Sequence, residues 1–485
     1  MVFSSHIFLF YFLPIFLLFT YILPFRYFTL MSTILSYGFY GWANPKWVLL
    51  MLASSYVDYF CGLALVKYGH VPMDGADLPY LPKGQPRNRA QTIALAVSIV
   101  SNISILGFFK YFDFAVSNIN AVAAKLGFGP DVIAFLHIAL PVGVSFYTFV
   151  SMSYAIDVYR GDARPLKNPI DYQCYVSLFP HLIAGPIIRY QTVADQIRFR
   201  TFTYEKFARG TAFFCLGMGK KVLLANPMGH IADNVFAAGG LHWQDAWYGL
   251  IAYAFQIYFD FSAYSDMAVG LALMIGFYFV KNFDDPYLAE SITDLWRRWH
   301  ISLSTWLRDY LYIPLGGNRL GKVRTHLNLM TVMLLGGLWH GASWNFLIWG
   351  GIHGGMLSLE RSRGGRGFFR RLPRVARIAL TFGVMCLSWV FFRSETLGRA
   401  LEFMRSLFGA GAALPGDNMV AAAIYTPYHI ASILLCALVV WGVPQTWNFT
   451  QRITPWKGAY CLAVFGLSVI FMWTQQVNPF LYFRF

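Results

Sequence analysis

Charged residues are scarce in this 485-residue chain. Asp, Glu, Lys and Arg together make up 13% of it, against roughly 25% in an ordinary soluble domain. Hydrophobic residues reach 57% and the mean hydropathy is +0.49, which excludes a disordered chain, a collagen, a coiled coil and a nucleic-acid binder. The apolar residues run continuously instead of alternating, which excludes a membrane β-barrel. The composition therefore predicts an all-α polytopic membrane protein.

Cysteine is also rare, and paired cysteine motifs are missing. The six cysteines are scattered, without the spacing of a zinc site or a disulfide framework. They are Cys61, Cys174, Cys215, Cys386, Cys436 and Cys461. The sequence also lacks a His-Glu-x-x-His motif and a Gly-x-Ser-x-Gly nucleophile elbow. We therefore expect no disulfide, no metal centre and no stable acyl-serine on this chain.

Apolar stretches close to the roughly 20 residues that cross a bilayer recur along the sequence. The first, residues 7–24, lacks a basic n-region and a small-residue cleavage site, so we expect a retained helix rather than a signal peptide. The others lie near residues 28–43, 47–66, 91–109, 131–156, 207–224, 246–259, 264–280, 327–358, 376–392, 426–442 and 458–473. Because 327–358 could hold one long or two short helices, the pattern predicts about 11–13 transmembrane or re-entrant helices.

The basic residues behind the net charge of +15 indicate which loops lie on the cytoplasmic side of the membrane. These residues fall between apolar stretches, where cytoplasmic loops of membrane proteins collect Lys and Arg. Residues 67–89 and the arginine-rich loop 361–377 should therefore be cytoplasmic, which places the N-terminus outside. Counting forward two spans from the first loop places Arg160, Arg164 and Lys167 inside as well, which is consistent with the same rule.

A tryptophan-rich polar stretch at residues 291–310 reads Ser-Ile-Thr-Asp-Leu-Trp-Arg-Arg-Trp-His-Ile-Ser-Leu-Ser-Thr-Trp-Leu-Arg-Asp-Tyr. At about 100° per residue, its aromatic and leucine side chains share one face, its arginines and hydroxyl residues take the other, and His300 lies at the border. The pattern predicts one continuous amphipathic helix at the membrane interface or along a polar cavity. The alternative is an interfacial anchor whose histidine only reaches toward the headgroups.

A second histidine, His340, is embedded in the apolar run 334–355 between Gly337 and Gly341. Small residues let a neighbouring helix or a ligand approach the backbone closely. His353 follows 13 residues later, about 140° round an unbroken helix, so we expect the two rings to face different surroundings. The pattern leaves open whether His340 is a hydrogen-bonded structural residue or a functional one.

Two further polar sites interrupt apolar runs. Asp260 and Asp266 lie between predicted spans, where a carboxylate could orient a histidine, bind an ion or cap a helix break, and we favour capping. The Gly185-Pro186 pair breaks a helix and predicts a re-entrant segment. Such a segment is permitted at membrane depth only if it is buried in protein or lines a cavity.

These motifs resemble those of the membrane-bound O-acyltransferase family. The resemblance is carried by the runs Trp-Arg-Arg-Trp-His-Ile-Ser-Leu-Ser, Gly-Gly-Leu-Trp-His-Gly, Tyr-Phe-Asp-Phe-Ser-Ala-Tyr-Ser-Asp and Pro-His-Leu-Ile-Ala-Gly-Pro, with the opening Met-Val-Phe-Ser-Ser and the closing Asn-Pro-Phe-Leu-Tyr-Phe. It extends nearly end to end and is closest to the membrane subunit of bacterial exopolysaccharide O-acetylation, as in alginate and cellulose acetylation. We expect one membrane domain over residues 1–485 with a motif core at about 180–360. The resemblance implies a funnel or tunnel that meets a central histidine.

By this resemblance, the essential family histidine carries over to His340 and the second motif histidine to His300. Transfer of an acetyl group from a thioester to a hydroxyl needs a base for the hydroxyl proton and donors for the developing oxyanion. A neutral imidazole in an apolar site can be that base. Further candidates for orienting the base, stabilising the oxyanion or binding substrate are Arg297, Arg308, Asp309, Asn345 and Trp339.

The motifs and the resemblance together predict an O-acetyltransferase of the bacterial inner membrane, with acetyl-CoA as donor substrate and no bound cofactor. The donor is cytosolic and the acceptor lies outside, so we expect the acetyl group to pass via His340 to a periplasmic SGNH-type acetyltransferase or to an exopolysaccharide hydroxyl. Besides membrane lipid, a polysaccharide synthase complex is a further expected partner. Three alternatives stay open: a flippase of polysaccharide precursors, a noncatalytic scaffold, and a D-alanyl transferase fed by a carrier protein.

Overall fold

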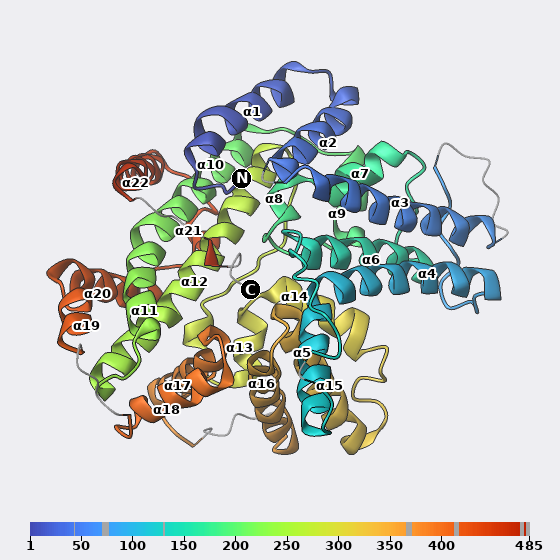
Figure 1. Ribbon diagram of the computed structural model, residues 1–485. Coiled ribbons are helices and arrows are strands. Elements are labelled where there is room, and N and C mark those ends of the chain that lie inside the picture. Colours follow the sequence, from blue (N-terminus) through green and yellow to red (C-terminus); the bar gives the residue numbers. More distant parts are fainter. Residues whose placement is uncertain are drawn as a thin grey trace. The chain divides into compact units, whose positions relative to one another are not determined.

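The protein is helical throughout its described part. The computed structural model describes residues 1–42, 44–69, 77–129, 131–364, 371–411, 417–475 and 480–481. Helices make up 74% of the structure and no strand occurs in these ranges (Figure 1). The predicted all-α class is confirmed. Contacts divide the chain into two compact units, one formed by Met1–Tyr204 and Ala272–Phe279, the other by Glu205–Leu271 and Val280–Phe485.

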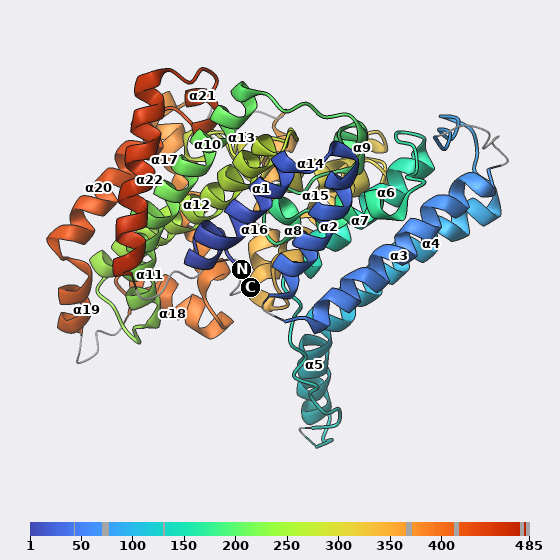
Figure 2. The same cartoon turned by 90° about the horizontal axis from the view of Figure 1, so that it is seen from above.

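In the first unit, α3 (Lys46–Lys67) and α4 (Arg89–Leu106) lie side by side (Figure 2). A buried carboxylate joins them. Asp58 accepts a hydrogen bond from Ser98 Oγ, and the Asn102 Nδ2 group donates to both of its oxygens, at 2.9 and 2.8 Å. These partners offset the cost of removing a carboxylate from water. The other elements are η1 (Phe8–Phe12), α1 (Leu13–Ile22), α2 (Phe25–Gly41), η2 (Gly107–Tyr111), α5 (Phe112–Lys125), α6 (Val144–Arg160), α7 (Pro169–Ser177), α8 (Phe179–Leu182) and α9 (Tyr190–Arg198).

The second unit contains both histidine motifs. Its helices, with short π- or 3₁₀-helical segments marked η, are α10 (Tyr204–Gly219), η3 (Lys220–Ala225), α11 (Asn226–Ala237), α12 (Trp243–Met274), η4 (Pro286–Leu288), α13 (Ile292–Arg298), α14 (Ile301–Leu307), η5 (Arg308–Tyr312), α15 (Gly321–His340), α16 (Trp344–Ser362), α17 (Arg374–Arg393), α18 (Leu397–Leu407), α19 (Asp417–Ile424), α20 (Pro427–Gly442), α21 (Thr446–Phe449) and α22 (Pro455–Thr474). The first residue of α10 and the last three residues of α12 belong to the first unit.

Several helices are long and apolar enough to cross a membrane. By length and hydropathy alone, four helices of the described part qualify, and two shorter helices are also apolar. The four are Lys46–Lys67, Arg89–Lys125, Arg374–Arg393 and Pro455–Thr474, and the shorter two are Phe8–Ile22 and Pro427–Gly442. Other described helices are shorter or more polar. The chain is a multi-pass membrane protein, as the composition predicts.

Helix α12 corrects one expectation. We predicted a break between spans 246–259 and 264–280, with Asp260 and Asp266 as caps, but α12 runs unbroken through both carboxylates. Capping is wrong because each carboxylate meets a lysine: Asp260 Oδ1 lies 2.7 Å from Lys221 Nζ and Asp266 Oδ2 lies 2.7 Å from Lys220 Nζ. Paired in this way, the four charges are accommodated inside the unit.

The break predicted at Gly185-Pro186 is confirmed. Helix α8 ends at Leu182, α9 begins at Tyr190, and the non-helical backbone between them includes the pair. Residues 182–188 are buried in the first unit, which is the condition under which irregular backbone is tolerated in a membrane protein.

Helices α15 and α16 form a closely packed hairpin. A Cβ atom on Gly337 would fall on the carbonyl oxygen of Phe346, and one on Gly350 would fall on that of Met333. Only glycine permits this backbone approach. The run 334–355 is therefore the end of α15 and the start of α16, and the glycines allow the two helices to pack at this distance.

We expect Gly350→Ala to lower the stability of the protein by about 1–3 kcal/mol, because the new methyl group cannot fit against the Met333 carbonyl. Gly355→Ala in the same helix is the matched control, since a Cβ there meets nothing within 4 Å. That change should raise stability by about 0.5–1 kcal/mol, the usual gain of alanine over glycine in a helix. Thermal unfolding of both variants in detergent measures the difference. Equal midpoints would contradict the packing argument.

Candidate functional site

The first motif is not one helix. The continuous amphipathic helix predicted over residues 291–310 is wrong, because α13 ends at Arg298 and α14 begins at Ile301. Between them His300 has a φ of 45°, in the left-handed region. That conformation costs a non-glycine residue roughly 1–2 kcal/mol, so the surroundings of His300 must stabilise it.

Asn282 is the residue that binds His300. Its Oδ1 lies 3.1 Å from His300 Nδ1 and also accepts from Ser302, at 3.2 Å from the backbone N and 2.9 Å from Oγ. The Asn282 Nδ2 group donates to Ser265 Oγ at 2.9 Å. A carbonyl oxygen can only accept, so His300 Nδ1 must carry the proton in this contact.

The other ring nitrogen of His300 is therefore an unprotonated acceptor. His300 is 1% exposed, and its Nε2 atom has no hydrogen-bond partner in the part of the chain that the structure describes. Burial lowers the pKa of His300, which keeps the ring neutral. The ring of Phe261 meets it edge-on, with centroids 4.6 Å apart. A buried, unprotonated nitrogen without a partner is a functional-site feature, since buried polar atoms are normally satisfied.

His340 is the last residue of α15 and is enclosed by aromatic rings. Its ring centroid lies 4.9 Å from Trp339, 5.3 Å from Trp349 of α16 and 5.1 Å from Phe392 of α17. Trp339 also approaches His300, at 6.2 Å. The two motif histidines therefore belong to one buried cluster, with Trp339 in contact with both.

His353 differs from these two histidines in its hydrogen bonding. Its Nδ1 accepts from Trp296 Nε1 at 3.3 Å, and its Nε2 lies 3.1 Å from Ser388 Oγ. The unbroken helix assumed between His340 and His353 is wrong, because the chain turns back after His340 and both rings contact Trp349. Their other partners differ, as predicted. With both nitrogens engaged, His353 is a structural residue.

Asn345 lies near His340 at the start of α16. Its Nδ2 donates to the backbone carbonyl of Ser394 at 2.7 Å, which ties α16 to the end of α17. Two buried atoms here have no hydrogen-bond partner within the described ranges: Asn345 Oδ1 and Trp349 Nε1. The indole N–H of Trp349 is thus a buried donor on a ring that contacts His340.

The structure places the remaining candidates at the surface. Arg297 is exposed. The Arg308 side chain is 60% exposed and pairs with its neighbour Asp309 at 2.7 Å. In contrast, His300 and His340 are only 1% and 7% exposed. Among the residues described, no group of three or more His, Cys, Asp or Glu side chains could hold a metal ion.

Sequence reasoning missed Asn282, Phe261, Trp349 and Phe392 as parts of this site. Phe261 lies in the Tyr-Phe-Asp-Phe motif and Trp349 in the run 334–355, but as apolar residues they gave no sign of contact with a histidine, and nothing local distinguishes Phe392. Asn282 gave a weak signal, since it is an uncharged polar residue directly after the apolar run 264–280 and Lys281. Its role depends on a contact that only the folded chain creates.

A multi-pass helical membrane protein with a buried imidazole cluster is the class that this fold and site define. The sequence model of the membrane-bound O-acyltransferase family matches residues 163–392. The chain is 41% identical over 520 residues to the "Probable alginate O-acetylase AlgI" of Azotobacter vinelandii, covering 100% of both chains. It is 43% identical to the protein of the same name from Pseudomonas aeruginosa, covering 92% of this chain and 82% of that one. It is 33% identical to the "Peptidoglycan O-acetyltransferase" of Helicobacter pylori, covering 100% of this chain and 98% of that one.

The chain belongs to the membrane-bound O-acyltransferase family, and it is an O-acyltransferase. The predicted resemblance is confirmed, and the flippase and scaffold alternatives give way to an enzyme. The matched segment begins at residue 163 and ends at residue 392, so it includes both motif histidines, Asn282 and the aromatic rings around His340.

Proposed function

We propose that this protein takes acetyl groups from cytosolic acetyl-CoA and delivers them to an exopolysaccharide of the alginate or cellulose type. Delivery is either direct or through a periplasmic SGNH-type acetyltransferase in a complex with the polysaccharide synthase. The names of the full-length relatives, alginate O-acetylase and peptidoglycan O-acetyltransferase, support an acetyl group and a polysaccharide acceptor. D-alanyl transfer is the second candidate, because more distant relatives are teichoic acid D-alanyltransferases, at 26% identity over 44% of this chain.

The observation that carries the proposal is the buried cluster of His340, Trp339 and His300. In the proposed reaction the acceptor hydroxyl oxygen attacks the thioester carbonyl carbon and its proton passes to the imidazole of His340. The carbonyl becomes an oxyanion. When this intermediate collapses, the C–S bond breaks and the thiolate of coenzyme A takes the proton from His340, which restores the neutral ring.

The neighbouring side chains divide the remaining tasks by their hydrogen-bonding capacity. Trp349 Nε1 is a buried donor beside His340 and is our candidate for stabilising the oxyanion. His300 cannot do this as a neutral ring, because its Nε2 only accepts; it instead provides a second acceptor for the hydroxyl proton or for an N–H of His340. Asn345 positions α16 through Ser394.

The charge pattern supports the proposed direction of transfer. Loop 361–377 carries seven arginines, which favours a cytoplasmic position, an N-terminus in the periplasm and a place in the bacterial inner membrane. Arg366 and Arg370 of that loop lie outside the described residues. The same loop is a candidate for contact with coenzyme A phosphates.

The test uses the purified protein in liposomes with acetyl-CoA labelled in its acetyl group. We expect label to appear on an alginate or cellulose oligosaccharide enclosed with its periplasmic acetyltransferase, and release of free coenzyme A outside. A D-alanyl carrier protein loaded with labelled D-alanine serves as the competing donor. Transfer from that carrier and none from acetyl-CoA would overturn the proposal in favour of the second candidate.

A further inference from the structure

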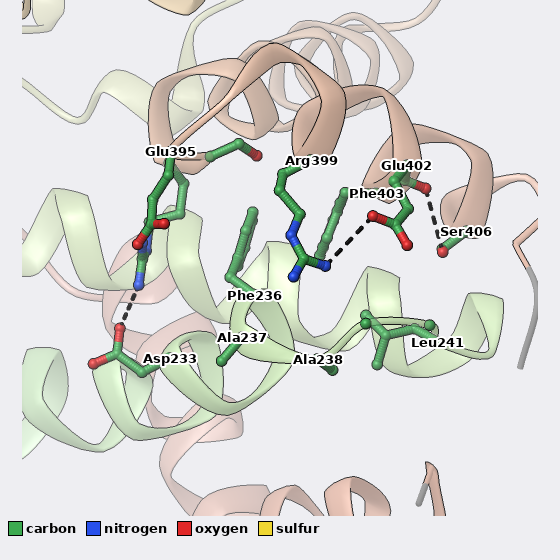
Figure 3. Close-up of a pocket in the computed structure, with 14 residues that line it drawn as sticks. Asp233, Phe236, Ala237, Ala238, Leu241, Glu395, Arg399, Glu402, Phe403 and Ser406 are labelled. Carbon is green, nitrogen blue, oxygen red and sulfur yellow. Dashed lines mark hydrogen bonds and ion pairs between the residues drawn. The ribbon is translucent and has the colours of Figure 1, made fainter. Parts of the chain in front are cut away.

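A second polar site lies in the same unit, at the end of α17. The end of α11, the end of α17 with the residues after it, and α18 form a pocket of about 290 Å³. Figure 3 shows the residues that line it. Three carboxylates and two guanidinium groups line it, together with the rings of Phe236 and Phe403. Its volume is at the small end of the range for ligand sites, about 300–1,000 Å³. Such a pocket suits one or two small polar units rather than an apolar chain.

The charged groups of the pocket are paired in a way that leaves hydrogen-bonding capacity unused. Arg393 Nη2 lies 2.7 Å from Asp233 Oδ1, while Arg393 Nε is buried and has no hydrogen-bond partner in the described ranges. Arg399 Nη1 lies 3.4 Å from Glu402 Oε2, and these side chains are 55% and 49% exposed. So long and exposed an ion pair contributes little to stability.

Such pairs have the capacity to bind hydroxyl groups. Each guanidinium offers only donors and each carboxylate only acceptors, and a sugar hydroxyl both donates and accepts. A carboxylate beside a guanidinium can therefore engage neighbouring hydroxyls of one sugar ring by charge-assisted hydrogen bonds. Phe236 and Phe403, stacked 4.2 Å apart, provide an apolar wall for the C–H faces of such a ring.

The pocket adjoins the histidine cluster through the end of α17. Phe392, which packs on His340 with ring centroids 5.1 Å apart, directly precedes Arg393. Ser394, which lines the pocket, accepts the 2.7 Å hydrogen bond from Asn345. Helix α17 begins next to the arginine-rich loop, so if that loop is cytoplasmic, the pocket lies at the opposite face of the membrane.

We propose that this pocket binds a segment of the saccharide acceptor through its hydroxyl groups and holds it at the outer face beside His340. The inference rests on the proposed function, because it assigns the acceptor of that reaction. Arg399 and Glu402 are the residues that contact the sugar hydroxyls, and Arg393 with Asp233 forms the less exposed side of the pocket. The end of α17 connects the pocket to the histidine cluster through Phe392 and through the hydrogen bond between Ser394 and Asn345, so we expect the pocket to fix which part of the polymer meets the histidine.

The test measures binding without chemistry. Full-length protein carrying His340→Ala, in nanodiscs, is titrated with an unacetylated alginate hexasaccharide and with cellohexaose, and the Kd is measured by thermophoresis. We expect at least one probe to bind, and Arg399→Ala with Glu402→Ala to weaken that binding about tenfold or more. Arg405→Ala is the matched control, because Arg405 is an exposed arginine of α18 that does not line the pocket. This control should leave the Kd unchanged.

Any of four other outcomes would overturn the inference. It is wrong if neither probe binds, if the double variant binds as tightly as its parent, or if the Arg405 control weakens binding equally. It is also wrong if the double variant binds sugar normally but no longer co-purifies with the periplasmic acetyltransferase, since the pocket would then be a protein-docking site. Transfer of labelled acetyl from acetyl-CoA is measured in a separate experiment. If that transfer fails, the proposed function is wrong, but the Kd values for the saccharides can still be interpreted.

Discussion

Replacement of His340 by alanine is expected to lower the kcat of acyl transfer by about 10²–10⁴-fold, the usual contribution of a positioned general base. The ring is buried among Trp339, Trp349 and Phe392, so solvent water is poorly placed to replace it. The measurement is transfer of labelled acetyl from acetyl-CoA in liposomes, normalised to the amount of folded protein. Binding of acetyl-CoA should be retained, because the change removes a base rather than a donor site.

His353→Gln is the matched control for this experiment. His353 is also buried and also contacts Trp349, but its two nitrogens are engaged by Trp296 and Ser388. We expect this variant to unfold at a lower temperature and to keep its activity per folded molecule. If His340→Ala retains activity, or if both variants lose it equally, His340 has no special part in the chemistry and the proposed mechanism fails.

Asn282→Leu is expected to lower the free energy of unfolding by about 2–5 kcal/mol, because it removes the acceptor that the buried N–H groups of His300 and Ser302 share. It also releases His300 from its left-handed conformation. The displaced ring should reduce acyl transfer roughly 10–100-fold at temperatures where the variant is still folded. Thermal unfolding in detergent and transfer of labelled acetyl measure the two effects.

Two further variants separate positioning from simple destabilisation. Asn282→Asp keeps an oxygen acceptor for His300 Nδ1 and should recover part of the activity. If Asn282 acts through His300, the double variant Asn282→Leu with His300→Gln should be no less active than His300→Gln alone. Fully additive losses would show that Asn282 affects the reaction independently of the histidine.

Much of this molecule could be predicted from local patterns. The membrane class follows from composition, because a chain with 13% charged residues cannot cover itself with polar surface. The helix break at Gly185-Pro186 follows from proline chemistry, and the importance of the two motifs follows from the cost of placing histidine in an apolar run. These features depend on residue type and neighbours in sequence, so they needed no knowledge of contacts.

The prediction of an unbroken helix over residues 291–310 failed, and so did the prediction that two carboxylates cap a helix break. Asp260 and Asp266 look like helix caps until Lys221 and Lys220 are found beside them. Arg297 and Arg308 share a motif with His300, yet the structure exposes both arginines and buries the histidine. A local pattern cannot report a partner that is distant in the sequence.

The amino-acid sequence by itself determined a helical membrane protein and the two histidines of its motifs, but it left open whether residues 327–358 form one helix or two. Only the tertiary structure decided which ring nitrogens of His300 and His353 have a hydrogen-bond partner. Asn282 lies 18 residues before His300 and accepts a hydrogen bond from its Nδ1, whereas Trp296 and Ser388 occupy both nitrogens of His353. The reason is physical: a hydrogen bond depends on distance and direction between groups that only folding brings together.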